Sequence, residues 1–342
     1  MKDRLNVGVI GCGGISSVHI PALMDMEEAK IVAVCDTNAE RRQKAQEMTG
    51  ADAYADWHDV IARKDIDIVH ILTPHYLHAP MAIAFLKAGK HVLTEKPMAS
   101  EIDAALEMIR TADECEPSLN VIFQNRYNVS TVLLKQEIES GKLGALKCAR
   151  ASICWHRTEP YYTQSGWRGF FKTEGGGSLI NQSIHTLDLL SYLGGPIKRV
   201  KGHVSTDVLD NVIEVEDNCH AVFEYENGAV GVLHTTNSYG VDAPIMLEMV
   251  FENATYQILA EKLFKIEDGI PVLVARGDDA KELGGKSYWG ASHKTQIKDV
   301  YAHILRGEHF AIDGRSAFPA LNLVKAIYES SAKNAWVSLL KV

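Results

Sequence analysis

The sequence predicts an α/β protein of two domains, the first built on a doubly wound parallel sheet and the second on a mainly antiparallel sheet. Its 342 residues exceed what one hydrophobic core usually serves, which favours two domains. Up to about residue 125, short apolar runs alternate with helical segments. Beyond that point, strand-like segments follow one another with few helices between them. This change of pattern predicts a domain boundary between residues 123 and 124.

The first predicted domain, residues 1–123, alternates strands and helices through short connections. Strands that are separated by a helix pair in parallel, so a doubly wound sheet is expected. The predicted strands are 5–10, 31–35, 66–72, 91–94 and 119–124, and the predicted helices are 15–26, 39–48, 79–88 and 102–114.

The second predicted domain, residues 124–342, has helices near its two ends and strands between them. The dipeptide Asn227-Gly228 separates two strand-like runs, and Asn-Gly is a strong hairpin signal. Strands that are joined by tight turns pair antiparallel. The predicted helices are 132–140, 294–305 and 317–334, and the predicted strands are 147–155, 197–205, 219–225, 229–236, 245–251 and 255–259.

The net charge, the apolar stretches and the cysteines indicate which partners and ligands to expect. There are 35 Lys and Arg residues against 44 Asp and Glu residues, a net charge of −9, and such a chain repels phosphate backbones, so no nucleic-acid partner is expected. We find no apolar stretch long enough to span a membrane and no signal peptide, so we expect a cytoplasmic protein without a membrane partner. The six cysteines form no Cys-x-x-Cys pair, so neither disulfides nor a metal site are expected.

A glycine-rich turn joins the first predicted strand to the first predicted helix. Glycine lets such a turn tighten and lets the backbone approach a pyrophosphate, while the helix N-terminus offers N–H groups to the phosphates. A plain tight turn is the alternative, because serine stands where the third glycine of the full fingerprint is expected. The residues of the turn are Gly11, Cys12, Gly13, Gly14, Ile15 and Ser16.

Asp36 ends the second predicted strand, where a ribose-binding carboxylate is expected. A carboxylate there accepts hydrogen bonds from ribose hydroxyls and repels a 2′-phosphate, which favours NAD over NADP. We therefore assign Asp36, Thr37 and Arg41 to the cofactor site. Arg41 and Arg42 keep NADP as the alternative cofactor, and a helix N-cap is the alternative role of Asp36, although Asn38 could also supply that cap.

Glu95-Lys96-Pro97 follows the predicted strand 91–94. The carboxyl ends of strands in a doubly wound sheet face the ligand crevice, so Lys96 points to where a nicotinamide would lie. Proline at position 97 restricts the backbone of Lys96.

These motifs together resemble the family of glucose–fructose oxidoreductases and inositol dehydrogenases, known as Gfo/Idh/MocA. The resemblance covers nearly the whole chain. It implies a Rossmann domain followed by an α/β domain with a large open sheet, through which members commonly form dimers or tetramers. The segments that carry it are 11–15, 73–78 (Thr-Pro-His-Tyr-Leu-His), 95–97 and 175–188 (Gly-Gly-Gly-Ser-Leu-Ile-Asn-Gln-Ser-Ile-His-Thr-Leu-Asp).

The resemblance also implies roles for single positions. Lys96 matches the family's catalytic lysine and His185 its catalytic histidine, while His75 stands where many members have asparagine. Arg126 matches a segment at the domain junction and is assigned to the substrate site. The positions assigned to the cofactor on this basis are Thr73, Pro74, His75, His78, Glu95, Lys96, Gln124, Trp167 and Arg168.

Asn181, His185 and Asp188 are spaced by four and three residues, which places them on one face of a helix. Their neighbours are apolar, so three buried polar groups there need partners. A satisfied core network is one interpretation. The family match favours catalysis, in which His185 takes the hydroxyl proton, Lys96 hydrogen-bonds the same oxygen, and Asp188 could hold the imidazole.

Residues 155–162 combine aromatic rings with hydrogen-bonding groups, a composition that suits a sugar ring. Within this segment we predict that His156, Arg157 and Tyr162 contact substrate, and the fork of Arg157 matches a carboxylate or phosphate. A loop that packs on the core is the alternative. A second ring-rich patch, which either reaches the cleft or anchors the tail, contains Tyr288, Trp289 and His293.

The predicted function is NAD-dependent oxidation of a ring secondary alcohol, with a sugar or polyol as substrate and a homodimer or homotetramer as the assembly. Asn181 stands where inositol dehydrogenases usually carry aspartate, which favours glycosides or nucleotide-linked sugars. One alternative is a glycoside-cleaving enzyme that recycles its NAD in each turnover. The other is a non-catalytic regulator that binds NAD, which the presence of both Lys96 and His185 disfavours.

Overall fold

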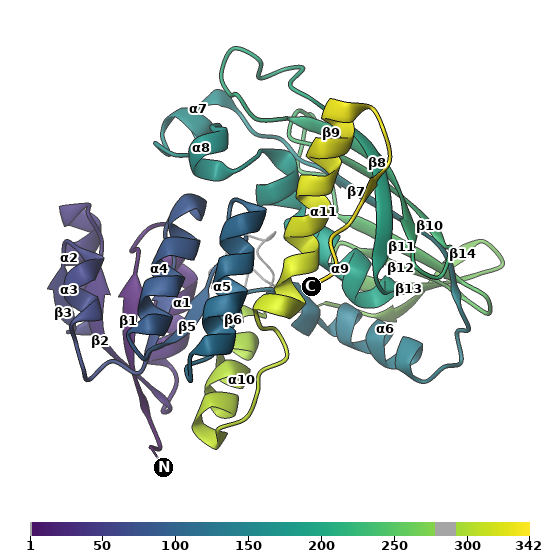
Figure 1. Ribbon diagram of the computed structural model, residues 1–342. Helices are drawn as coiled ribbons and strands as arrows, with labels where there is room; N and C mark the ends of the chain where they lie inside the picture. The colour runs from purple at the N-terminus through teal and green to yellow at the C-terminus, as the bar shows by residue number, and fades with distance from the viewer. Residues whose placement is uncertain (1, 278–291) are drawn as a thin grey trace. The chain divides into compact units, whose positions relative to one another are not determined.

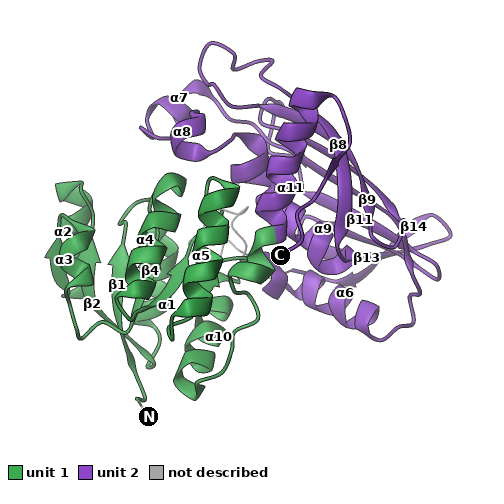
Figure 2. Ribbon diagram, viewed as in Figure 1, with its two compact units in different colours: residues 1–124, 279–318 green, residues 125–278, 319–342 purple. Residues whose placement is uncertain are grey.

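The computed structural model describes residues 2–277 and 292–342. The chain forms two compact units, which Figure 2 colours separately. Unit 1 comprises Met1–Gln124 and Asp279–Phe318, and unit 2 comprises Asn125–Asp278 and Pro319–Val342.

Unit 1 alternates strands and helices along the chain, as predicted (Figure 1). The sequence predicts neither β3 nor α3, because segments this short show no periodicity. The strands are β1 (Leu5–Ile10), β2 (Ala29–Cys35), β3 (Asp52–Tyr54), β4 (Ile68–Ile71), β5 (His91–Thr94) and β6 (Leu119–Val121), and the helices are α1 (Ser16–Met24), α2 (Ala39–Thr49), α3 (Trp57–Ile61), α4 (His75–Lys87), α5 (Ile102–Glu114) and α10 (His293–Arg306).

The strands of unit 1 form one six-stranded parallel sheet in the order β3-β2-β1-β4-β5-β6. The order reverses beside β1, which pairs with β2 on one side and with β4 on the other. In open sheets of this kind, ligands bind beyond the carboxyl ends of the strands at such a reversal. The predicted doubly wound parallel sheet is confirmed, and the reversal identifies the ends of β1, β4 and β5 as the place for a ligand.

Helix α10 belongs to unit 1, although it follows unit 2 residues in the chain. It packs against α1, and Lys294 at its start pairs with Asp25. Gln296 accepts a hydrogen bond from the Phe123 N–H at 3.0 Å and donates one to the Val121 carbonyl at 2.8 Å. The sequence-based division assigns all of 124–342 to the second domain. The compact units differ from that division because α10 and the residues after it, up to Phe318, join the first unit, where Ile312 and Asp313 pair with the edge strand β6.

Unit 2 is built around a second sheet. Its elements are α6 (Val129–Glu139), β7 (Leu146–Cys154), α7 (Glu159–Thr163), α8 (Phe171–Glu174), η2 (Ser178–Ser183), α9 (Ile184–Gly194), β8 (Ile197–Ser205), β9 (Asn218–Tyr225), β10 (Val230–Thr236), β11 (Met246–Phe251), β12 (Thr255–Leu259), β13 (Lys262–Glu267), β14 (Ile270–Ala275), β15 (Val337–Ser338) and most of α11 (Gly314–Lys333).

This second sheet has nine strands in the order β14-β13-β12-β11-β7-β10-β9-β8-β15. Neighbouring strands are antiparallel except for β7 and β10, which run parallel. Side chains alternate along β9, where Cys219, Ala221, Phe223 and Tyr225 are buried, so one face of the sheet belongs to the core. Helix α9 packs against β7 and β11. The predicted mainly antiparallel sheet is confirmed. Among the helices of the described residues, none is both long enough and apolar enough to cross a membrane.

The turn after β1 requires glycine at its first position. Gly11 has a φ of 98°, and a Cβ there would lie 2.7 Å from the carbonyl oxygen of Leu72. Gly14 in the same turn has no atom within 4 Å of the Cβ position. The backbone of β1 therefore approaches the end of β4 more closely at Gly11 than any side chain allows.

We expect Gly11→Ala to lower the free energy of unfolding by about 3 kcal/mol, since left-handed backbone strain and overpacking add. Gly14→Ala is the matched control, with an expected change within about 0.5 kcal/mol. Denaturant unfolding without cofactor measures both. Equal losses in the two variants would contradict the close approach at Gly11.

Candidate cofactor and catalytic site

The glycine turn of unit 1 is closed by its own hydrogen bonds. Ser16, at the position of the expected third glycine, is buried and donates its hydroxyl to the Gly13 carbonyl at 2.6 Å. The side chain therefore fits this position without an unpaired polar group. Gly14 and Ile15 remain at least partly exposed at the start of α1. The turn thus keeps the form expected for a phosphate-binding loop at a helix N-terminus.

Asp36 ties the glycine turn to the end of β2. Its Oδ2 atom accepts the Cys12 N–H at 2.8 Å, and its Oδ1 atom accepts the Asn38 N–H at 2.8 Å. The N-cap of α2 is Asn38, whose side chain accepts the Arg41 N–H at 3.0 Å. Asp36 is therefore not the helix cap. Each of its oxygens keeps a further lone pair for a ribose hydroxyl.

Other predicted cofactor residues lie around this turn. The Arg41 guanidinium lies beside Gly13, with Nη1 3.9 Å from where a Cβ of that glycine would be. Thr37 is exposed on the loop before α2. The backbone N–H of Cys12 is directed at Asp36, so this residue holds the turn together.

The loops after β4 and β5 are joined by a histidine. The Nε2 atom of His78 lies 2.8 Å from the Thr73 carbonyl, and its Nδ1 atom lies 2.7 Å from the Pro97 carbonyl. Burial lowers the pKa of His78, against these backbone hydrogen bonds, which raise it. Pro74 is the N-cap residue of α4, and His75 begins that helix as a buried side chain. The loop that carries Thr73 and the loop that carries Lys96 therefore form one connected wall.

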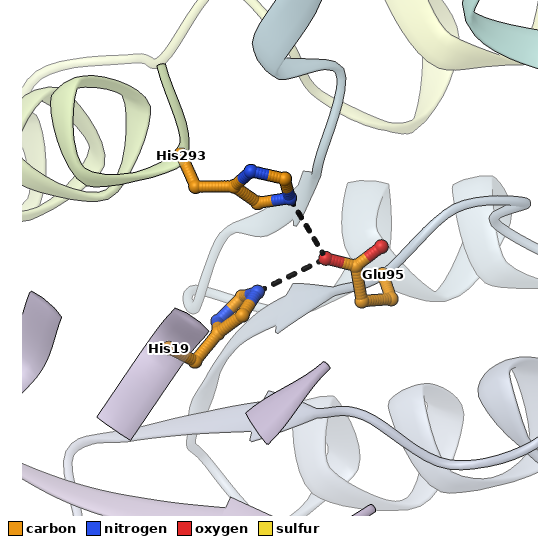
Figure 3. A group of neighbouring side chains, drawn as sticks. All are labelled: His19, Glu95 and His293. Carbon is orange, nitrogen blue, oxygen red and sulfur yellow. Dashed lines mark hydrogen bonds and ion pairs between the residues drawn. The ribbon is translucent and has the colours of Figure 1, made fainter. Parts of the chain in front are cut away.

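Glu95 fixes the loop that carries Lys96. Its N–H donates to the Ile71 carbonyl at 3.0 Å, and its Oε2 atom accepts the Lys96 N–H at 3.3 Å. The other carboxylate oxygen, Oε1, faces two histidines, His19 and His293 (Figure 3). Burial alone would raise the pKa of Glu95, but the hydrogen bonds from His19 and His293 hold it well below its ordinary value. Glu95 is therefore a buried anion directly before Lys96.

In unit 2, the segment that carries the predicted catalytic stripe is not one regular helix. Ser178–Ser183 is a π-helix and Ile184–Gly194 is an α-helix. The spacing of Asn181 from His185 therefore crosses a change of helix type, which the prediction of one α-helical face did not include. A single π-helical turn inside a helix is common at functional sites.

Buried Glu216 holds the start of this segment. Its carboxylate accepts the Gly177 N–H and the Leu179 N–H, each at 2.8 Å, and the Tyr328 hydroxyl at 2.9 Å. A Cβ on Gly177 would lie 2.0 Å from the Glu216 carbonyl oxygen, so the glycine allows this approach. The glycine run before the helix thus sets the position of Asn181 and His185.

Asp188 is paired with Arg126. The carboxylate receives the arginine fork at 2.8 Å and 2.5 Å, and both side chains are buried. We predicted that Asp188 could hold the imidazole of His185. Both of its oxygens accept hydrogen bonds from Arg126, which gives the buried guanidinium a counter-ion. The guanidinium of Arg126, which we predicted to contact substrate, is the partner in this buried ion pair.

Asn181 is held by a carboxylate that the sequence analysis missed. Glu174 is buried, accepts the Asn181 amide at 2.5 Å through Oε1, and accepts the Gly169 N–H at 2.6 Å through Oε2. Burial raises the pKa of Glu174 to about 7, against the hydrogen bonds from Gly169 and Asn181. The only sequence signal was a charged residue immediately before the glycine run.

Polar side chains of the predicted substrate segment are hydrogen-bonded to other residues of unit 2. Asp242 accepts hydrogen bonds from the Arg157 guanidinium at 2.9 Å and from the His156 N–H at 2.8 Å. The His156 ring lies 2.7 Å from the Tyr239 carbonyl. Tyr162 packs in a buried cluster with Leu209, Ile213 and Val215. It has the position of a core side chain, which is the alternative that the sequence left open.

Tyr161 and the two residues before Gly169 form the more open aromatic surface. The Arg168 guanidinium lies 4.6 Å from the ring centroids of both Tyr161 and Trp167. Gln182 donates to the Tyr161 hydroxyl at 2.9 Å. We did not select Tyr161 or Gln182 from the sequence, because a Tyr-Tyr pair does not say which ring is buried.

The remaining predicted residues are distributed over both units. Gln124 is buried and begins the 3-10 turn Gln124–Tyr127. Of the second ring-rich patch, Tyr288 and Trp289 lie outside the described residues. His293 is buried beside Glu95. Lys96 belongs to unit 1, whereas His185 belongs to unit 2.

A glycine turn with a ribose-type carboxylate on a doubly wound sheet, followed by an open sheet with a buried polar helix, defines a nicotinamide-dependent oxidoreductase. Comparison with known proteins agrees. Residues 5–123 match the model of the oxidoreductase family with an NAD-binding Rossmann fold, and residues 131–257 match the Gfo/Idh/MocA C-terminal domain. The chain belongs to the Gfo/Idh/MocA family of oxidoreductases.

Individual relatives are similar over most of the chain. Inositol 2-dehydrogenase of Rubrobacter xylanophilus is 30% identical over 75% of this chain and 72% of its own length. Levoglucosan dehydrogenase of Pseudarthrobacter phenanthrenivorans is 26% identical over 99% of both chains. The crystal structure of the WlbA dehydrogenase of Bordetella pertussis with NADH and UDP-GlcNAcA has a TM-score of 0.87 and 30% identity, covering 99% of this chain and 100% of that one.

Glu174 predicts a pH dependence of stability. Its folded-state pKa of about 7 lies above the ordinary value of 4.5, so the folded chain binds the proton more tightly than the unfolded chain. Stability therefore falls as pH rises from 4.5 through 7, and the loss is complete above pH 7. This shift corresponds to about 3 kcal/mol.

Glu174→Gln removes this titration. Relative to wild type, we expect the free energy of unfolding of the variant to increase by about 3 kcal/mol between pH 4.5 and pH 8. Glu159→Gln, at an exposed carboxylate of α7, is the control and should show no such trend. Denaturant unfolding over a pH series measures the difference. A difference between Glu174→Gln and wild type that stays constant with pH would contradict the raised pKa.

Proposed function

We propose that the protein is an NAD-dependent dehydrogenase that oxidises a ring secondary alcohol of a sugar or glycoside to a ketone. The observation that carries the proposal is Lys96, which a buried anion holds just after β5 in the unit that also carries the glycine turn. The residues of that turn fit NAD, since Gly14 is exposed with no atom within 4 Å of its Cβ position and Asp36 has lone pairs for ribose hydroxyls. Bound NAD supplies the hydride acceptor.

The protein side of the reaction is a proton transfer. An imidazole can accept a hydroxyl proton at neutral pH, and we assign that role to His185. Lys96 donates a hydrogen bond to the same oxygen and stabilises the negative charge that develops there. Asn181, which Glu174 holds in place, lies one turn before His185 and is assigned to substrate hydroxyls.

The substrate class follows from the relatives and from the charges of unit 2. Relatives carry the names levoglucosan dehydrogenase, D-glucoside 3-dehydrogenase and inositol 2-dehydrogenase, and the WlbA structure contains UDP-GlcNAcA. Arg157 is neutralised by Asp242, so it is not the anchor for an acidic sugar. Tyr161, Trp167 and Arg168 offer a ring-stacking surface for a glycoside.

A second candidate function is glycoside cleavage with internal recycling of NAD. Proteins named glycosyl hydrolase family 109 are 28% identical over 52% of this chain and 42% of their own length. The two candidates differ in one observable, because cleavage leaves no net NADH.

We also infer that the protein acts as a homodimer or homotetramer in the cytoplasm. On the face of the second sheet opposite the core, Val222, Val230 and Val232 are 40%, 47% and 46% exposed, an apolar surface suited to a second copy. All six cysteines are free thiols, which agrees with a reducing compartment.

The first test is an absorbance screen at 340 nm with NAD, and separately NADP, against inositols, free hexoses, alkyl glucosides, hexuronates and UDP-sugars. We expect NADH growth with a glycoside or nucleotide-linked sugar and NAD. Release of the aglycone without NADH would instead support glycoside cleavage.

With the substrate from that screen, Lys96→Met should lower turnover about 100-fold or more and leave NAD affinity nearly unchanged, because the charge acts on the developing alkoxide. Lys87→Met, at an exposed position of α4, is the control and should retain activity. Turnover rates and calorimetric titration with NAD measure the two effects. Full turnover in Lys96→Met would remove the lysine from the mechanism.

A further inference from the structure

A continuous run of buried polar side chains in unit 1 ends beside Lys96. Tyr301 on α10 lies 2.9 Å from His70 on β4, through the hydroxyl and Nε2. The Nδ1 atoms of His70 and His19 are 2.9 Å apart, and Nε2 of His19 lies 3.0 Å from Oε1 of Glu95. His293 approaches the same oxygen at 3.6 Å (Figure 3). Neither His19 nor His70 was singled out by the sequence analysis, and neither has any exposed surface.

The protonation of the run follows from its burial. Burial lowers the pKa of His19 and lowers the pKa of His70 well below its ordinary value, so both rings are neutral at pH 7 and each carries one N–H. Glu95 is ionised and only accepts hydrogen bonds. Each ring therefore donates on one side and accepts on the other.

The direction of the run is set by Tyr301. Among the described residues the hydrogen-bond partner of its buried hydroxyl is His70, so the O–H donates to Nε2 of that ring. His70 then donates from Nδ1 to His19, and His19 donates from Nε2 to Glu95. The reverse direction leaves the phenol hydrogen unpaired and turns a bare ring nitrogen toward a carboxylate. A buried donor without a partner keeps the full cost of its desolvation, so the first direction is favoured.

The same side chains resemble a metal site in composition. The ligand atoms of His19, Glu95 and His293 all lie within 4.8 Å of one another. A metal ion would need a bare Nε2 atom on His19, and that tautomer requires the reverse direction of the run. The donor count therefore favours a hydrogen-bonded chain over a metal site.

The geometry points to a positioning device for Lys96: His19, locked in one tautomer by His70 and Tyr301, fixes the Glu95 carboxylate, and Glu95 fixes the backbone of Lys96. Glu95 is held at its own N–H by Ile71 and accepts the Lys96 N–H. His78 holds the loop from the other side through the Pro97 carbonyl. The role of Lys96 rests on the proposed dehydrogenase function. Tyr301 has no exposed surface, so the run as described offers a proton no route to solvent.

Kinetics of two variants at position 19 test the consequence for catalysis. His19→Leu removes both hydrogen bonds, and we expect kcat to fall about 100-fold while KM and NAD affinity stay within about threefold, since displacement of a positioned group costs turnover. His19→Gln offers one donor and one acceptor and should recover most of the loss. His91→Leu, at the opposite end of β5, is the matched control and should retain kcat. Equal losses in the Leu and Gln variants, or a loss confined to KM, would overturn the positioning role.

A measurement that needs no substrate tests the hydrogen-bonded run from Tyr301 to Glu95. Long-range proton–nitrogen NMR spectra of the histidine-labelled full-length protein, assigned with the His19→Gln variant and a His70→Gln variant, report which ring nitrogen carries the proton. We expect Nδ1–H on His70 and Nε2–H on His19. The reverse tautomers, a charged ring, or stoichiometric metal in the purified protein that His293→Ala abolishes, would overturn the inference. If the wild-type protein oxidises no sugar, the proposed function is contradicted. The NMR spectrum still tests the direction of the hydrogen-bonded run.

Discussion

A carboxylate that is partly or fully removed from water requires hydrogen-bond donors, and this requirement organises the loops of each unit. Asp36 accepts the backbone N–H groups of Cys12 and Asn38, so the glycine turn and the end of β2 share one conformation. Glu95 accepts the Lys96 N–H and faces two histidines. An unpaired carboxylate in these places would cost several kcal/mol, so each loop adopts the conformation that supplies donors.

The same rule governs unit 2. Glu216 accepts two backbone N–H groups at the start of η2, and Glu174 holds Asn181 and Gly169. Both carboxylates accept hydrogen bonds from backbone N–H groups as well as from side chains. The helix that carries His185 is therefore fixed at its start by charge and close packing, not by helix propensity, and its π-helical turn persists because the surroundings determine it.

The two units differ in how many of their predicted functional side chains are paired with other residues of the protein. In unit 1 the predicted cofactor residues Gly14 and Thr37 are exposed, and Asp36 keeps lone pairs beyond the two backbone N–H groups that it accepts. In unit 2 several residues that looked available for substrate are paired within the chain, as Arg126 is with Asp188 and Arg157 is with Asp242. Among the described residues of unit 2, Tyr161, Trp167 and Arg168 are partly exposed, and our proposal assigns sugar recognition to their rings and hydrogen-bonding groups.

The sequence by itself determined the class of fold and the family, because strand–helix alternation and the short motifs at 11–15, 73–78, 95–97 and 175–188 are each local in the chain. Only the tertiary structure decided which polar groups meet. Whether Tyr161 or Tyr162 is buried, and whether Asp188 faces an arginine or a histidine, depends on elements far apart in sequence. The hydrogen-bonded run from Tyr301 to Glu95 joins residues from α10, β4, α1 and the loop after β5. No periodicity within one segment carries that information, since packing selects hydrogen-bond partners.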